Sequence, residues 1–284
     1  FKSMKNNTSG DYNSAIGAYT LLANTTGNYN LALGHNTLKS NISGSSNIAI
    51  GAKALSTNTT KSFLVAIGDS ALFNNGTGAT TNEAIANTAV GSKTLYANTT
   101  GSFNTAIGFE SLQLNTDGFS NTAIGSYSLN SNTSGRSNTA FGVDALSSNE
   151  TGDYNTVVGA TAYWYNDSGE KNTVIGFSAG ALATGNSNVY IGHLAGYDAT
   201  GDNKLYIDND NNTTPLIFGD FSAQRVGFGS TTPDSKVDIR SSGTTEDPLR
   251  VRVGSASKLR VHAANGSVSV GTSVQGPENG LMSQ

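Results

Sequence analysis

The chain has 284 residues, of which 34 are Gly, none is Cys and only 13% are charged. A formal net charge of −4 excludes the broad basic field that draws nucleic acid, and the lack of Cys excludes disulfides, thiolate metal sites and thiol chemistry. No apolar run is long enough to span a bilayer, so we expect no membrane insertion.

A short sequence motif that ends in a glycine recurs eleven times, with its glycines between residues 17 and 192. The step between these glycines is 17 residues, except for one step of 23 after Gly68 and one of 16 before Gly192. A period this short does not encode a unit that folds alone, so we expect each copy to be one coil of a stack. The anchor glycines are Gly17, Gly34, Gly51, Gly68, Gly91, Gly108, Gly125, Gly142, Gly159, Gly176 and Gly192.

Within each copy, small and apolar residues alternate before the anchor glycine, which is the period-2 pattern of a strand. A Leu four residues after the anchor indicates a second short strand, and Asn-Thr-Thr-Gly or Asn-Thr-Ser-Gly clusters indicate tight turns. No segment keeps a helical apolar stripe free of Gly. Two successive copies define the structural repeat through Asn104, Ile107, Gly108, Leu112, Asn121, Ile124, Gly125 and Leu129.

These patterns predict an all-β fold, a parallel β-roll or β-solenoid of 17-residue coils over residues 1–202. At about 4.8 Å per coil, eleven coils make a stack about 50 Å long. An Asn recurs four residues before the anchor in ten copies, for example at Asn104 and Asn121, and we expect these amides to form a hydrogen-bonded ladder along the stack.

The predicted coils have little apolar material for a core. Each offers about three apolar side chains for burial, and its Ala and Gly positions are too small to fill space. Association along the length of the stack would supply the missing burial. We therefore expect the chain to bind itself as a parallel homotrimer.

The longest interruption of the repeat is an insertion of six residues between Gly78 and Asn87, and the copy before it is also irregular. There Lys61 replaces the turn glycine and Leu64 replaces the Asn. Insertions in repeat proteins emerge as loops. One interpretation is a receptor-contacting bulge, and the other is a tolerated surface insertion. The candidate contacts are Thr80, Asn82 and Glu83.

A second interruption brings three aromatic residues together at Tyr163, Trp164 and Tyr165, where the repeat Leu is lost. Exposed aromatic rings stack on the apolar faces of sugars, which makes all three candidate receptor contacts. Alternatively, they enlarge the core or cover a contact between copies.

Residues 203–284 differ in character from the repeats, since charge rises and short alternating strands are predicted at 216–221, 237–240, 248–253, 259–262 and 268–270. We interpret this region as a second β module, either a trimeric prism or part of a fibre shaft. Arg250 and its neighbours at alternating positions form either an anion-binding stripe or a solvated face.

The repeat phrase Asn-Thr-Ala-Ile-Gly at residues 104–108 resembles the repeats in the heads of trimeric autotransporter adhesins, which form left-handed parallel β-roll trimers with a somewhat shorter period. The chain resembles tail-fibre-like proteins of bacteria and their phages more closely. Those proteins follow such repeats with segments similar to residues 203–208, 225–233 and 236–239. The resemblance implies a trimeric extracellular fibre.

We find no pattern of catalytic, cofactor-binding or metal-binding residues, and expect no enzyme and no cofactor. The three histidines, His35, His193 and His262, lack metal-ligand spacing, and no serine lies in a nucleophile elbow. The acidic run that begins at Asp208 offers oxygen ligands for calcium but lacks the Gly and Glu of a helical calcium loop, so an ordinary polar turn is expected.

The sequence therefore favours a non-enzymatic attachment fibre on the surface of a cell, a virion or a phage-like injection device, with a cell-surface glycan or protein as receptor. Because the sequence starts at Phe1 without a Met or a signal sequence, we expect it to be part of a longer product.

Two alternatives remain. An ice-binding solenoid requires a flat Thr-x-Thr array. A polysaccharide-degrading tail spike requires paired carboxylates in one groove, whereas the acidic residues Glu83, Glu110, Asp117 and Glu150 are scattered over different repeats.

Overall fold

The fold is known from a computed structural model, which describes residues 2–211, 213–240, 249–253, 256–261, 268–270 and 281–282. The fold is all-β, as predicted, and the described residues include no helix. The chain divides into two compact units, Phe1–Asp202 and Asn203–Gln284. His262 lies outside the described residues.

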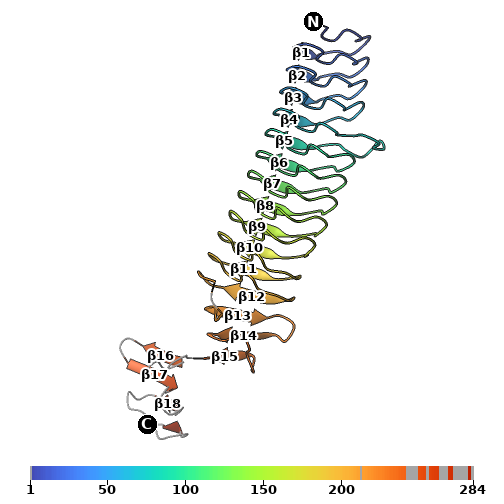
Figure 1. Cartoon of the computed structure of the whole chain (residues 1–284). Helices are drawn as coiled ribbons and strands as arrows, with labels where there is room; N and C mark the ends of the chain where they lie inside the picture. Colours follow the sequence, from blue (N-terminus) through green and yellow to red (C-terminus); the bar gives the residue numbers. More distant parts are fainter. Residues whose placement is uncertain are drawn as a thin grey trace. The chain divides into compact units, whose positions relative to one another are not determined.

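The first unit is a stack of eleven coils, each with one three-residue strand, and the coils follow one another in chain order (Figure 1). Neighbouring strands pair in parallel, so one continuous sheet runs along the stack. The strands are β1 (Ser14–Ile16), β2 (Leu31–Leu33), β3 (Ile48–Ile50), β4 (Val65–Ile67), β5 (Thr88–Val90), β6 (Thr105–Ile107), β7 (Thr122–Ile124), β8 (Thr139–Phe141), β9 (Thr156–Val158), β10 (Thr173–Ile175) and β11 (Val189–Ile191).

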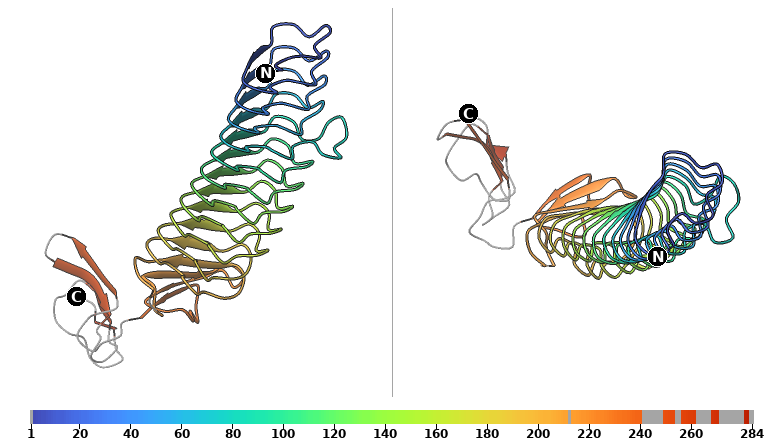
Figure 2. Two further views of the ribbon diagram at one scale, coloured as in Figure 1. Left: turned by 45° about the horizontal axis from the view of Figure 1, so that its top comes forward. Right: turned by 90° about the horizontal axis from the view of Figure 1, so that it is seen from above.

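Each residue of a strand pairs with the equivalent residue of the next repeat, as Thr105 does with Thr122. The pairing of Val65 with Thr88 shows that the step of 23 residues leaves the register intact. The six additional residues therefore lie outside the sheet. Viewed along the stack, the coils overlie one another, which confirms the predicted parallel β-solenoid (Figure 2).

In strands β2 to β8 the residue that faces the core is Ala, and in β9 to β11 it is Val157, Val174 and Tyr190. Ala106 is fully buried between Thr105, which is half-buried, and Ile107, which is exposed, and the same order recurs along the stack. We expected the Ala positions to be too small to fill space, and the structure places Ala as the buried strand residue in seven of the eleven strands. Where the inward residue is Ala, the larger first and third residues of the strand point outward.

The Leu that lies four residues after eight of the eleven anchors supplies most of the apolar core. The prediction that it marks a second strand was wrong, because it lies in a turn with positive φ, +50° at Leu112. A positive φ is unfavourable for Leu, but it aims the side chain into the coil, where burial of a Leu side chain contributes about 1.5–3 kcal/mol. The fully buried members are Leu21, Leu38, Leu55, Leu72, Leu95, Leu112, Leu129 and Leu146.

The anchor glycines are required by the close approach of successive coils. Gly108 has a φ of +133°, and a Cβ placed on it would lie 2.5 Å from the carbonyl carbon and oxygen of Gly125. No larger residue fits this position without displacing the neighbouring coil.

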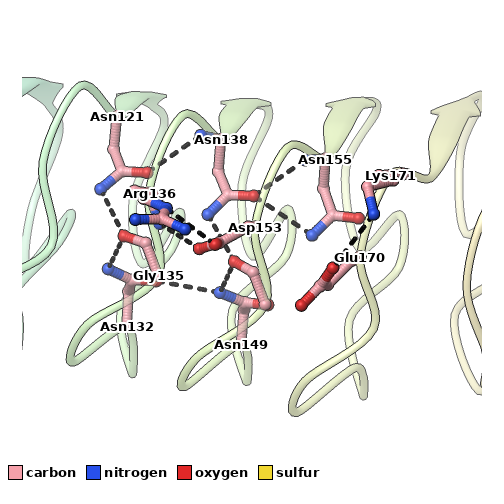
Figure 3. A network of polar contacts seen from close by, with 11 residues as sticks. Asn121, Asn132, Gly135, Arg136, Asn138, Asn149, Asp153, Asn155, Glu170 and Lys171 are labelled. Atoms are coloured by element: carbon pink, nitrogen blue, oxygen red, sulfur yellow. Dashed lines mark hydrogen bonds and ion pairs between the residues drawn. The ribbon is translucent and has the colours of Figure 1, made fainter.

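The predicted Asn ladder forms, although backbone groups carry much of it. The side-chain oxygen of Asn104 accepts the backbone N–H of Asn121 at 3.0 Å. In the same way, the Asn121 oxygen accepts the N–H of Asn138 at 3.0 Å (Figure 3). The amide nitrogen of Asn121 donates to the carbonyl oxygen of Gly135 at 2.8 Å. The ladder thus satisfies turn groups that the strands leave unpaired.

A second Asn ladder runs through the turns and was not predicted. The Asn132 side-chain amide donates to the Asn115 oxygen at 2.8 Å. It also donates to the Gly135 carbonyl at 3.0 Å, and the Asn149 amide donates to the Asn132 oxygen at 2.9 Å (Figure 3). Here side-chain amides bond directly to one another, as in cross-β stacks. Its members are Asn7, Asn24, Asn41, Asn58, Asn75, Asn98, Asn115, Asn132, Asn149 and Asn166.

The second unit contains the predicted short strands, together with strands that were not predicted from alternation. The strands are β12 (Lys204–Ile207), β13 (Ile217–Asp220), β14 (Arg225–Phe228), β15 (Val237–Ile239), β16 (Leu249–Val253), β17 (Ala256–Val261), β18 (Val268–Val270) and β19 (Leu281–Met282). Strands β12, β13 and β14 pair antiparallel, β15 pairs with β14 in parallel, and β16 to β19 form a separate sheet.

Candidate functional site

The outward face of strands β1 to β11 carries a continuous row of apolar side chains. The third residue of every strand is apolar, and none of the eleven is buried; Ile16 is 66% exposed and Phe141 is 53% exposed. We call the outward side of these strands the strand face. Its apolar row consists of Ile16, Leu33, Ile50, Ile67, Val90, Ile107, Ile124, Phe141, Val158, Ile175 and Ile191.

A second row on the strand face, formed by the first residue of each strand, changes character along the stack. It is apolar at Leu31, Ile48 and Val65, and it is Thr in every strand from β5 to β10. The third residue of each strand lies on the same face as the first, and it is always apolar, so no Thr-x-Thr array forms. The strand face is therefore mainly an apolar surface.

The insertion forms a loop between Asn75 and Ala84, and Figure 1 shows it extending beyond the adjacent coils between β4 and β5. The side-chain amide of Asn75 donates to the Ala84 carbonyl at 2.9 Å, which is the bond that Asn98 makes to Gly101 in a regular turn. Residues 76–83 thus replace the two residues of a regular turn. We call them the inserted loop.

The inserted loop is held in place by hydrogen bonds from Lys61, in the preceding turn, and to Glu83, within the loop. Lys61 is 4% exposed, and its ammonium donates to the carbonyl oxygens of Ala79, at 3.3 Å, and Thr80. The backbone N–H of Thr80 donates to the carboxylate of Glu83 at 2.7 Å. This hydrogen bond is the main cause that lowers the pKa of Glu83, and the charge of Lys61 adds a smaller contribution. Glu83 is therefore held as an ionised carboxylate.

Beside the inserted loop lies a hollow of about 320 Å³, which we call the loop hollow. It is lined by Glu83, Thr100, Ser102, Phe103, Asp117 and Phe119. Three successive coils contribute to it, so residues 34 positions apart in the sequence come together. Glu83 and Asp117 lie in different repeats, as the sequence shows, and the stack brings both of them to the lining of one hollow.

One sequence signal marks the loop hollow. In nine of the eleven coils the residue before the turn glycine, or before the residue in its place, is Ser or Thr. Glu83 and Asp117 are the two exceptions, and they flank Thr100 in this row. Among the other candidate contacts of the inserted loop, Thr80 and Asn82 are exposed.

The aromatic cluster divides into a buried and an exposed part. Tyr163 occupies the Leu position, is fully buried and donates its hydroxyl to the Gly185 carbonyl at 2.9 Å, so it is unavailable as a receptor contact. Burial raises the pKa of Tyr163. Trp164 and Tyr165 remain exposed, and Tyr165 borders a second hollow of about 280 Å³.

The described residues hold no group of three or more His, Asp or Glu side chains placed to bind a metal ion. His35 packs against Tyr19 and His193 stacks on Phe177. At the start of the acidic run, the Asp208 carboxylate accepts the N–H of Asn209 at 2.9 Å, as in an ordinary polar turn.

In the part of the chain that the structure describes, no helix has the length and apolar character needed to cross a membrane. Comparison of the chain with models of protein families, with curated proteins and with solved structures found no match.

Proposed function

We propose that the chain is a non-enzymatic structural fibre for attachment, built from three parallel copies that join through their strand faces. The observation that carries this proposal is the uninterrupted apolar row on the strand face, which continues over all eleven coils. Soluble single chains rarely expose apolar patches larger than a few hundred Å², and larger ones mark contacts with a partner.

A second copy of the chain fits the strand face because its coils repeat at the same spacing of about 4.8 Å. When copies lie parallel, each outward apolar residue, such as Ile107 or Ile124, meets an equivalent row in register along a length of about 50 Å. Closed cyclic symmetry is the usual arrangement of identical subunits, and three copies around one axis cover all three strand faces at once.

The chemistry of the loop hollow supports binding rather than hydrolysis. Hydrolysis of a glycosidic bond requires one carboxylic acid with a raised pKa that donates a proton to the leaving oxygen. The pKa of Glu83 is lowered instead, since its carboxylate accepts the N–H of Thr80. Glu83 therefore does not have the raised pKa that the proton donor of a polysaccharide-degrading spike requires.

The strand face does not favour ice binding either. Its Thr row, from Thr88 to Thr173, is paired with Val, Ile and Phe, and the row turns apolar at both ends. An apolar row of varied shape suits contact with another chain better than contact with a regular ice lattice.

As an extracellular fibre on a cell, virion or injection device, the chain would bind a surface glycan or protein. Three copies in one fibre present three identical loops, and the effective concentration of the second and third contacts strengthens weak single contacts by avidity.

The test of this proposal is to place charges on the strand face. In Ile107→Lys/Ile124→Lys, the cationic side chains remain solvated in one chain but would be buried between copies. We expect the unaltered chain to sediment at three times 29.2 kDa and the double variant at the mass of one chain. We also expect the variant to lose attachment to cells that the unaltered chain binds.

The matched control is Leu114→Lys, because Leu114 is also exposed but lies six residues past Gly108 and off the strand face. This control should keep the trimer mass. A single-chain mass for the unaltered protein, or a trimer that tolerates both lysines on the strand face, would refute the proposal.

A further inference from the structure

We infer that the loop hollow binds a non-acidic pyranose sugar, so that the inserted loop supplies the glycan-binding site of the fibre. This inference rests on the proposed attachment function and names the ligand class and the residues that recognise it. With a volume of about 320 Å³, the loop hollow lies at the lower end of the range of about 300–1,000 Å³ that small-molecule sites occupy.

Two aromatic rings give the loop hollow its apolar surface. Phe103 is 59% exposed and Phe119 is 41% exposed, and they come from successive coils. The C–H groups on one side of a pyranose ring form an apolar face that packs against such rings. Phe103 has a φ of +60°, and its backbone N–H donates to Ile85 at 3.1 Å, so the ring is carried by rigid backbone.

The polar part of the loop hollow provides the complementary hydrogen-bonding groups. Carboxyl oxygens accept hydrogen bonds from sugar hydroxyls, and Glu83 and Asp117 supply one carboxyl group on each side of Thr100. The hydroxyl of Thr100 both donates and accepts. Apolar rings next to convergent acceptors match a ligand with one apolar face and a hydroxylated rim, which describes a pyranose.

The charges around the loop hollow select against acidic sugars. Its lining contains two carboxylates and no cationic side chain. Arg136 lies over the ring of Phe119, 5.8 Å from its centroid, but its guanidinium is paired with Asp153 at 2.9 Å. A carboxylated sugar would therefore meet net repulsion, whereas a neutral or amine-bearing pyranose would not.

The Glu83 side of the loop hollow is organised before a ligand arrives. Lys61 is buried and holds the carbonyl of Thr80, while the N–H of Thr80 holds the Glu83 carboxylate. A ligand therefore does not have to order this carboxylate on binding, which reduces the entropic cost. The second hollow, beside Tyr165, lacks the paired rings that the loop hollow has.

The direct test is saturation-transfer NMR of the full chain with single methyl glycosides of neutral hexoses, glucosamine and glucuronic acid. At about 10 mM sugar the method detects dissociation constants in the millimolar range. We expect transfer to at least one neutral or amine-bearing pyranose, strongest at the protons of its apolar face, and none to glucuronic acid.

Two variants connect this binding to the loop hollow. Phe103→Ala and Asp117→Asn alter exposed side chains, so the coil should remain folded, and each should weaken sugar binding about tenfold, equivalent to about 1.4 kcal/mol. The control is Phe63→Ala, since Phe63 occupies the same repeat position as Phe103 outside the loop hollow. Phe63→Ala should bind sugar like the unaltered chain.

The inference is overturned if no sugar receives saturation, if glucuronic acid binds best, or if the two variants in the loop hollow bind like Phe63→Ala. Its failure can be told apart from failure of the proposed function. A chain that stays trimeric and attaches to cells, but does so equally well with Phe103→Ala, retains the attachment function and places the receptor contact elsewhere.

Discussion

The regular coils from residue 91 to residue 159 and the irregular coil around the inserted loop form the same stack with different turns. In the regular coils, both Asn ladders are continuous and a glycine completes each turn. In the irregular coil, Lys61 stands in the glycine position, Leu64 stands in the Asn position, and the side-chain oxygen of Asn58 has no hydrogen-bond partner within the described part of the chain.

The strand register nevertheless continues through the irregular coil, from Val65 to Thr88. The comparison teaches that strand pairing and the buried Leu row maintain the stack. The turn that carries the second Asn ladder can change in length and sequence without breaking the stack. Leu64 keeps one part of the first ladder, because its backbone N–H still donates to the Asn47 oxygen at 3.1 Å. The largest departure from the repeat in this coil is thus in a turn, beside the loop hollow.

The largest contrast between the two regions is expected from glycine substitutions. In Gly108→Ala, the new Cβ would lie 2.5 Å from the backbone of Gly125, and we expect a loss of about 3–5 kcal/mol in the free energy of unfolding. In Gly78→Ala, in the inserted loop, the Cβ meets open space at a φ of +76°, so we expect about 1 kcal/mol from backbone strain alone. Urea unfolding followed by circular dichroism measures both, and equal losses would contradict the account.

A smaller contrast is expected along the second Asn ladder. Asn132→Ala removes two donated bonds and leaves the Asn149 amide without its Asn132 acceptor, which should cost about 2–4 kcal/mol. Asn58→Ala removes two donated bonds of 3.1 Å but no accepted one, and should cost about 1 kcal/mol less. The same unfolding measurement compares them. A costlier Asn58→Ala would show that the ladder is not interrupted there.

Removing the buried ammonium should loosen the inserted loop rather than the stack. Lys61→Met keeps most of the side-chain volume but leaves the Ala79 and Thr80 carbonyls without their donor. We expect faster proteolysis within residues 76–83 and faster amide exchange at Thr80, with little change at β6 or β7. Lys39→Met, at a position outside the loop, is the control and should leave both unchanged.

The smallest effect is expected from an exposed ion pair on the regular coils. Lys93 donates to Glu110 at 3.0 Å, and this bond raises the pKa of Lys93. A raised pKa means that the pair stabilises the fold below the unfolded value of 10.5 and that this stabilisation is lost as the pH rises through the folded value. Because the pair is exposed, Glu110→Gln should leave the unfolding midpoint at pH 7 within the scatter of repeated scans.

The stack itself was predictable from the sequence, because a constant 17-residue step fixes both the repeat and the strand register. The Asn ladder at Asn104 and Asn121 was predictable for the same reason, since identical amides at a constant step must lie above one another. The inserted loop was located from one step of 23 residues.

The orientation of Ala106 and Ile107 was not predictable, since alternation shows that two residues face opposite sides but not which side is the core. Apolarity alone would favour burying Ile107. In the structure, Leu112 is buried from the turn, and the strand residue buried beside it is the smaller Ala106. The positive φ of Leu112 could not be predicted from the residue type, because Gly or Asn is the usual residue for that conformation.

The central claim, that copies join in parallel through their strand faces, is tested most directly by a single cysteine on that face. The chain has no Cys of its own, so Ile107→Cys reports on one position only. On mild oxidation, parallel copies in register bring identical residues together, and the account predicts a disulfide-linked pair of chains from Ile107→Cys and none from Leu114→Cys. No linked pair from Ile107→Cys, or equal linking by both variants, would contradict it.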